Sequence, residues 1–192
     1  MRSLLRGRAA AIGLNAALRV LIAGVVVDAL LNPDATRYAG KAIGTRGLVL
    51  IPASLLLPAL RRRRGASDPY PFWTDNLYLS IFALDMGGNL FDLYDRYFFF
   101  DLIPHAHGGG AITLVASEVL RAPVLVGVGI SQVAHILLEA QEYYSDVLFN
   151  LRNVRGTWDT VNDLLAGVAG SLAYGAIYAT RHGGVGWLSR RS

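Results

Sequence analysis

The strongest constraint on the fold of this chain is a set of long apolar stretches that contain no carboxylate, Lys or Arg. Residues 122–138 and residues 164–180 each form such a stretch of 17 residues, and residues 102–117 form one of 16. A helix needs about 20 mostly apolar residues to cross a bilayer, with a range of about 17–25. With their flanks included, these three stretches predict membrane-spanning helices.

Three further stretches are apolar but contain one or two charged side chains each. They cover residues 9–33, 42–60 and 72–90. Ionisable groups at membrane depth cost about 2.5–3.5 kcal/mol each on insertion scales, so they usually face a cavity or a partner. Arg19 and Asp28 lie nine residues apart, on opposite faces of one helix, so each needs a partner elsewhere in the fold.

The sequence therefore predicts an all-α fold, a polytopic transmembrane bundle of about six helices. The whole chain, 1–192, is expected to form a single integral membrane domain. The spans are expected near residues 9–33, 42–60, 72–90, 102–120, 122–142 and 160–180.

The distribution of Lys and Arg predicts the orientation of the bundle, because short cytoplasmic loops carry an excess of both. Six spans with the N-terminus inside place 11 of the 18 basic residues on the cytoplasmic side and six on the outer side, with Arg19 inside a span. The run Arg61–Arg64 is decisive. We expect both termini in the cytoplasm and a multi-pass membrane protein. The net charge of +4 is then a topology signal and implies no nucleic-acid partner.

Composition excludes several other classes of protein. Hydrophobic residues make up 53% of the chain and charged residues 17%, against about 25% charged in a soluble domain. A disordered tail and an ordinary soluble nucleic-acid binder are excluded. The chain has no Cys, which excludes a disulfide scaffold, a zinc finger and a thiol nucleophile. It also lacks a Gly-x-Ser-x-Gly element and a nucleotide-binding fingerprint, and no haem is implied.

Three ionisable residues share one face of the fifth predicted span. His135, Glu139 and Glu142 are spaced i, i+4 and i+7, which covers about two turns of a helix. His and carboxylate side chains on such a face are typical metal ligands. The alternative is a solvated Glu pair at the end of a helix, with His135 satisfied by a neighbouring side chain.

A second group lies at the start of the fourth predicted span. Asp101 and His105 are again i and i+4, followed by His107 and the run Gly108–Gly110. Pro104 predicts an irregular backbone or the first turn of a helix. The glycines would permit close approach of another helix or a ligand. Asp101 could bond the far nitrogen of a liganding His105, a common arrangement around metals; the alternative is an exposed, Gly-rich outer loop.

A third group of polar residues enters the last apolar stretch, and it comprises Asp159, Asn162 and Asp163. Thr160 with Asp163 resembles a capping box, which would explain Asp163 as a helix cap. A cap does not explain why all three residues enter a membrane helix together. Farther along the same stretch, pairs of small residues four apart, such as Gly167 with Ser171, predict close helix packing.

Glu118 stands apart from these groups. It lies 13 residues beyond His105, about 20 Å deeper along a helix. We therefore expect it near the inner surface, close to Arg121, and unable to share a metal with His105 unless the segment re-enters the membrane.

The order of these motifs resembles the YjdF-type family of bacterial inner-membrane proteins over about residues 95–175. The resemblance rests on Asp101-x-x-x-His105, Glu118, Glu139-x-x-Glu142 and Gly156-x-Trp158-Asp159-Thr160-x-x-Asp163. A looser likeness exists to VanZ-like membrane proteins. The resemblance implies a membrane fold, a multi-pass protein of the bacterial inner membrane and a shared polar site, and no particular reaction. His107, His135 and the run Gly108–Gly110 depart from the family pattern.

Three hypotheses for function follow. The first is an outward-facing site for a divalent metal ion that acts on a lipid or a lipid-linked envelope substrate, with Asp101, His105, Glu139, Glu142, Asp159 and Asp163 as ligands and His107, His135, Asn162 and Glu118 as secondary candidates. The second is a small proton-coupled or ion/solute transport protein, which at 192 residues would need to form a homodimer. The third is a structural or accessory membrane protein whose polar residues join helices and catalyse nothing. The sequence leaves open whether the protein is an enzyme.

Overall fold

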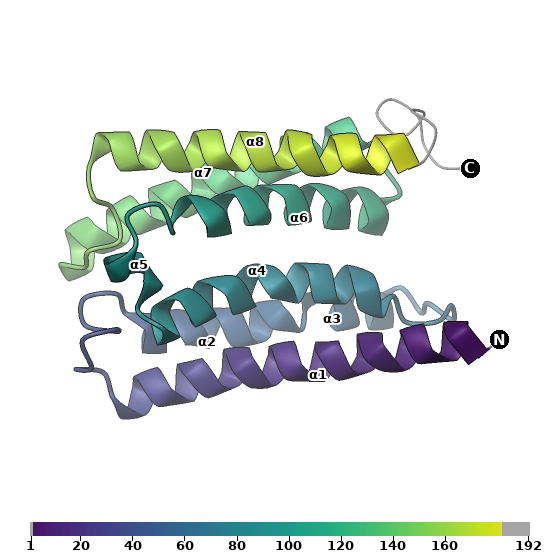
Figure 1. Ribbon diagram of the computed structural model, residues 1–192, viewed down its shortest axis with the longest axis horizontal. Coiled ribbons are helices and arrows are strands. Elements are labelled where there is room, and N and C mark those ends of the chain that lie inside the picture. The colour runs from purple at the N-terminus through teal and green to yellow at the C-terminus, as the bar shows by residue number, and fades with distance from the viewer. Residues whose placement is uncertain (1, 182–192) are drawn as a thin grey trace. The chain divides into compact units, whose positions relative to one another are not determined.

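The computed structural model describes residues 2–181 and contains helices but no strand within that range (Figure 1). This confirms the all-α prediction. The chain ends, which are predicted to lie in the cytoplasm, are Met1 and residues 182–192 and lie outside the described part. The helices are α1 (Arg2–Leu31), α2 (Ile43–Ser54), α3 (Leu56–Arg63), α4 (Phe72–Leu90), α5 (Leu93–Arg96), α6 (Leu102–Leu120), α7 (Val124–Phe149) and α8 (Thr157–Arg181).

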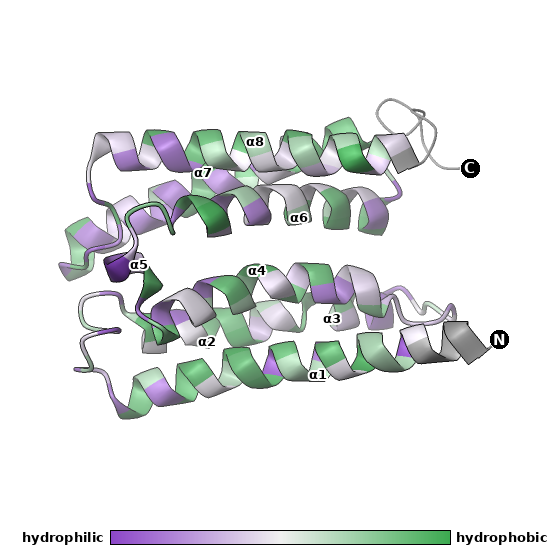
Figure 2. Ribbon diagram, in the orientation of Figure 1, coloured by the Kyte–Doolittle hydropathy of each residue, from purple (hydrophilic) through white to green (hydrophobic). Residues whose placement is uncertain are grey.

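Among residues 2–181, three helical segments are long and apolar enough to cross a membrane. They are Gly7–Leu31, Ile43–Arg63 and Val124–Phe149. Large apolar side chains on them face outward, for example Val133 and Leu137, which are 60% and 63% exposed. Figure 2 shows the hydrophobic residues that cover most of α1. Such outward-facing apolar surface is what a lipid-embedded helix presents, so the chain has the character of a membrane protein. The total of six spans and their orientation remain predictions.

The chain divides into two compact units, residues 1–93 and residues 94–192. In the first unit, α1 packs against α4 and α2. Its core is a buried cluster to which α1 contributes Val25 and Val26, α2 contributes Ile43 and α4 contributes Met86. These contacts bury one stripe of α1 and leave its opposite face apolar and exposed.

Ionisable side chains inside the first unit are paired, as the cost of burying them requires. Arg19 on α1 donates to the Oδ2 of Asp75 at 2.6 Å, and the Asp75 side chain is fully buried. Asp28 accepts hydrogen bonds from Arg37 and Tyr38 in the loop after α1. The expectation that Arg19 and Asp28 find separate partners is therefore confirmed.

A proline explains the break between α2 and α3. Pro58 has no N–H, so the carbonyl of Ser54, four residues earlier, loses its helical donor. The guanidinium of Arg19 donates to that carbonyl at 2.7 Å. One cation thus satisfies both a buried carboxylate and an orphaned backbone acceptor.

In the second unit, α6 makes its most extensive contacts with α8, and α7 packs against both. Glycines permit this close packing. A Cβ at Gly109 would overlap the backbone of Gly167, and one at Gly170 would overlap the carbonyl of Ala106. The run Gly108–Gly110 and the small residues of the last stretch therefore meet each other, as close packing of helices in lipid requires.

Candidate metal centre

The first turn of α6 brings Asp101 and His105 into one cluster. Asp101 is the N-cap residue of α6, and Pro104 occupies the first turn. Proline is tolerated there because its missing N–H would have no helical acceptor. The helical alternative for this segment is therefore confirmed and the exposed loop is wrong, because His105 is only 9% exposed.

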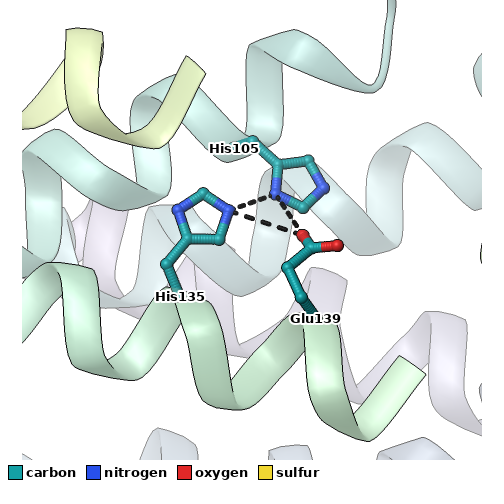
Figure 3. Close-up of side chains that lie close together, drawn as sticks. All are labelled: His105, His135 and Glu139. Atoms are coloured by element: carbon teal, nitrogen blue, oxygen red, sulfur yellow. Dashed lines mark hydrogen bonds and ion pairs between the residues drawn. The ribbon is translucent and has the colours of Figure 1, made fainter. Parts of the chain in front are cut away.

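Two residues that lie one turn apart on α7 face His105. His135 and Glu139 are both buried, and Figure 3 shows their side chains and that of His105 pointing toward one another. The Nδ1 of His105 lies 2.6 Å from the Nε2 of His135. The Oε1 of Glu139 lies 3.6 Å from the first nitrogen and 3.7 Å from the second.

These three atoms form a triangle of the size that surrounds a metal ion. The circle through the corners of a triangle with sides of 2.6, 3.6 and 3.7 Å has a radius of about 2.0 Å, and Zn–N and Zn–O bonds measure about 2.0–2.2 Å. An ion at or near the centre would reach all three donors with only small movements. Three protein ligands would also leave a fourth position open, as in catalytic zinc sites.

The other nitrogen of His105 faces two carboxylates. Its Nε2 lies 3.4 Å from the Oδ1 of Asp101 and 3.9 Å from the Oδ2 of Asp163. A metal-binding His commonly directs its second ring N–H at a carboxylate, which fixes the tautomer and orients the ring. The predicted pairing of Asp101 with His105 is consistent with this distance. Asp101, His105 and Asp163 also form a second group that could hold an ion on the Nε2 side.

Two oxygen atoms in the cluster are buried without a hydrogen-bond partner. They are the Oε1 of Glu139 and the Oδ1 of Asp163. A buried carboxylate oxygen without a partner is costly, and native structures seldom retain one without a reason. The Oε1 of Glu139 is the same atom that completes the triangle with the two imidazoles, so a bound cation would relieve this cost.

Comparisons with family models, with curated proteins and with solved structures found no match to this chain. The assignment of a function therefore rests on the chemistry of the cluster. Two imidazole nitrogens with one carboxylate suit Zn²⁺ and Fe²⁺, whereas Mg²⁺ and Ca²⁺ prefer oxygen donors throughout.

A glycine on α8 makes room for the His135 ring. A Cβ at Gly167 would overlap the Nδ1 and Cε1 atoms of that ring. The planes of the His135 and His105 rings are nearly parallel, 9° apart, with ring centroids 4.8 Å apart. The backbone of α8 and the ring of His105 together hold the Nε2 of His135 toward the cluster.

Two of the predicted ligands lie beside the cluster. Glu142 is half-buried one turn beyond Glu139 and interacts electrostatically with His105. Asp159 is also half-buried and interacts with Glu139. Its Oδ2 accepts the backbone N–H of Arg155 at 2.7 Å, which occupies that oxygen at the start of α8. Neither residue belongs to the groups close enough to share an ion.

The capping interpretation of Asp163 is wrong. Helix α8 begins at Thr157, so Asp163 lies in its second turn and is 4% exposed. The hydroxyl of Thr160 instead donates to the carboxylate of Glu139. Asp163 and Thr160 therefore support the cluster from α8.

The remaining secondary candidates differ in their surroundings. The Nδ1 of His107 lies 2.8 Å from the hydroxyl of Tyr174. Asn162 and Glu118 are exposed. Of the secondary candidates, His135 alone is within reach of the candidate ion. The spacing of four residues between His135 and Glu139 is the signal in the sequence that points to His135.

Proposed function

We propose that this chain is a metal-dependent protein of the bacterial inner membrane that binds one Zn²⁺ or similar divalent ion between α6, α7 and α8. The observation that carries the proposal is the triangle of His105 Nδ1, His135 Nε2 and Glu139 Oε1, whose centre is about one metal–ligand bond length from each atom. Binding would move the two nitrogens apart, from 2.6 Å toward the spacing of about 3.3 Å that tetrahedral ligands adopt.

The position of the cluster supports an outward-facing site. It lies at the N-terminal ends of α6 and α8 and around the middle of α7. In the predicted six-span topology, that end of the bundle faces away from the cytoplasm. The positive ends of two helix dipoles also favour the carboxylates gathered there.

The proposed substrate is a phosphate ester of a lipid or of a lipid-linked envelope precursor. A divalent ion with an open position can hold a phosphoryl oxygen and lower the pKa of a bound water. The water oxygen would bond to phosphorus as the bond from phosphorus to the lipid oxygen breaks. One proton of the water would pass to a carboxylate of the cluster, and the departing oxygen would take up a proton from solvent.

A second candidate function is proton transfer, and the 2.6 Å contact between His105 and His135 favours it specifically. Asp101, His105 and His135 form a continuous line in which a proton on one ring nitrogen could pass to the next group. Such relays mark proton pathways in membranes. This function would operate without a metal, so metal dependence separates the two.

The test is hydrolysis by purified protein in lipid vesicles, with a phospholipid and a polyprenyl diphosphate offered as substrates. We expect Zn²⁺-dependent release of phosphate or of the headgroup, reduced at least a hundredfold in His135→Ala and retained in His107→Gln. Hydrolysis that is equal in wild type and His135→Ala, or absent from Zn²⁺-loaded wild type with both substrates, would contradict the proposed reaction.

A further inference from the structure

A separate pocket lies in the first unit, at the end of a segment that is long and apolar enough to cross a membrane. Its volume is about 420 Å³, and it is lined by Arg61 and Arg62 from the last turn of α3, by the loop that follows, and by Tyr70. The apolar segment Ile43–Arg63 ends at this pocket. The pocket therefore lies where a spanning helix leaves the hydrocarbon and meets lipid headgroups.

The two arginines bring positive charge that the protein leaves available. The guanidinium of Arg61 donates to the backbone carbonyl of Asp68 and lies over the ring of Tyr70, 5.8 Å from its centroid. Arg62 is exposed. Within residues 2–181, no ion pair joins either arginine to a carboxylate. The remaining N–H groups form the planar fork that suits a phosphate.

Tyr70 is a fixed wall of the pocket. Its hydroxyl donates to the Oδ2 of Asp75 at 2.7 Å, which ties it to the buried pair of Asp75 and Arg19. Burial raises the pKa of the Tyr70 phenol, and the hydrogen bond to Asp75 raises it further, so the ring carries no negative charge at neutral pH. The one carboxylate that lines the pocket is Asp68, and two arginines outweigh it.

We propose that this pocket binds the phosphate headgroup of an anionic membrane lipid, held by Arg61 and Arg62 against the ring of Tyr70. The run Arg61–Arg64 is a topology signal in the sequence, and headgroup binding is a second role for its first two members. Basic pockets beside membrane helices are typical sites for anionic headgroups. The inference is independent of the metal centre, because every residue involved belongs to residues 1–93.

The test uses a matched pair of double variants. Arg61→Gln/Arg62→Gln and Arg63→Gln/Arg64→Gln remove the same charge from the same run, but only the first pair lines the pocket. Binding of dioctanoyl phosphatidylglycerol to detergent-solubilised protein would be measured by native mass spectrometry. Two lost contacts predict a decrease in affinity of at least tenfold for the first pair and less than threefold for the second.

Three further binding measurements test whether the pocket itself holds the headgroup. Arg62→Gln alone changes an exposed side chain, so it tests the pocket with little risk to folding, and we expect a several-fold loss. Asp68→Asn removes the opposing carboxylate and should strengthen binding. Dioctanoyl phosphatidylcholine should bind at least tenfold more weakly than phosphatidylglycerol.

Equal losses of affinity in the two double variants would overturn the proposal. Displacement of the lipid by millimolar inorganic phosphate would also overturn it, because free phosphate would then be the ligand.

Discussion

The ring planes of His105 and His135 are nearly parallel, 9° apart, and the Nδ1 of His105 faces the Nε2 of His135 at 2.6 Å. The two residues are 30 positions apart in the chain and come from different helices. Two imidazoles in this arrangement hold either a shared proton or a common cation between their facing nitrogens. Because an oxygen of Glu139 that has no hydrogen-bond partner faces the same two atoms, we propose that a metal ion occupies the position between them.

Asp101 is expected to position His105 through the imidazole nitrogen that faces away from the metal. Asp101→Asn should weaken Zn²⁺ affinity by about 10–100-fold, the usual effect of removing a carboxylate that orients a metal-binding His. Glu118→Gln is the matched control, since it makes the same chemical change on the exposed side of α6. Competition with a chelator of known affinity measures both, and equal affinities in the two variants would argue against the positioning role.

Metal binding should weaken as the pH falls. Imidazole and carboxylate ligands bind a metal only when deprotonated, and the ordinary pKa of His is about 6.5. With two His ligands, we expect the Zn²⁺ dissociation constant to rise by up to about a hundredfold per pH unit below pH 6. Titrations between pH 5 and pH 8 check this. His107→Gln should leave the profile unchanged, and a flat profile in wild type would exclude two imidazole ligands.

Gly167 is expected to be essential to both packing and metal affinity, because a Cβ there would overlap the ring of His135. Gly167→Ala should destabilise the protein by about 1–3 kcal/mol, the usual cost of overpacking, and should weaken metal binding by displacing His135. Gly129→Ala is the control, because a Cβ at Gly129 meets nothing within 4 Å. Thermal unfolding in detergent and chelator competition measure the two effects; identical behaviour of the variants would show that α8 does not hold the ring.

The pair of Arg19 and Asp75 should be the most sensitive ionic contact in the first unit. Asp75→Asn keeps the shape of the side chain but leaves the Arg19 cation without its counter-charge, and removing one partner of a buried pair costs about 3–5 kcal/mol. Arg19 is partly exposed, so we expect the lower end of this range. Asp34→Asn makes the same change at an exposed position and should have little effect. Unfolding by sodium dodecyl sulfate in mixed micelles measures the difference.

Helix positions could largely be predicted from the apolar stretches, but their exact starts could not. The sequence favours a helix cap for Asp163 because Thr160 precedes it by three residues. The helix begins earlier, after Gly156, whose φ of +126° suits glycine, and the Asp159 carboxylate accepts the Arg155 N–H there. These local contacts place Asp163 one turn inside α8, where it faces His105.

The candidate ligands could be predicted as a group but not ranked. Glu139 and Glu142 both share a helix face with His135, so spacing alone treats them alike. Which of them meets His105 depends on the height at which α6 crosses α7, and that height is set by tight contacts such as Gly127 against Thr113. Hydropathy patterns specify the buried face of a helix but not the register between two helices.

The most direct test of the metal site is a measurement of metal content by inductively coupled plasma mass spectrometry. The protein would be purified in mild detergent without chelators. Wild type, Glu139→Gln and Glu142→Gln would be compared after equilibration with one equivalent of Zn²⁺ and removal of unbound ion. We expect about one ion per chain in wild type and in Glu142→Gln, and a loss of most of it in Glu139→Gln. Wild-type protein that retains no ion, or a Glu139→Gln variant that retains as much as wild type, would contradict the assignment of a metal to this cluster.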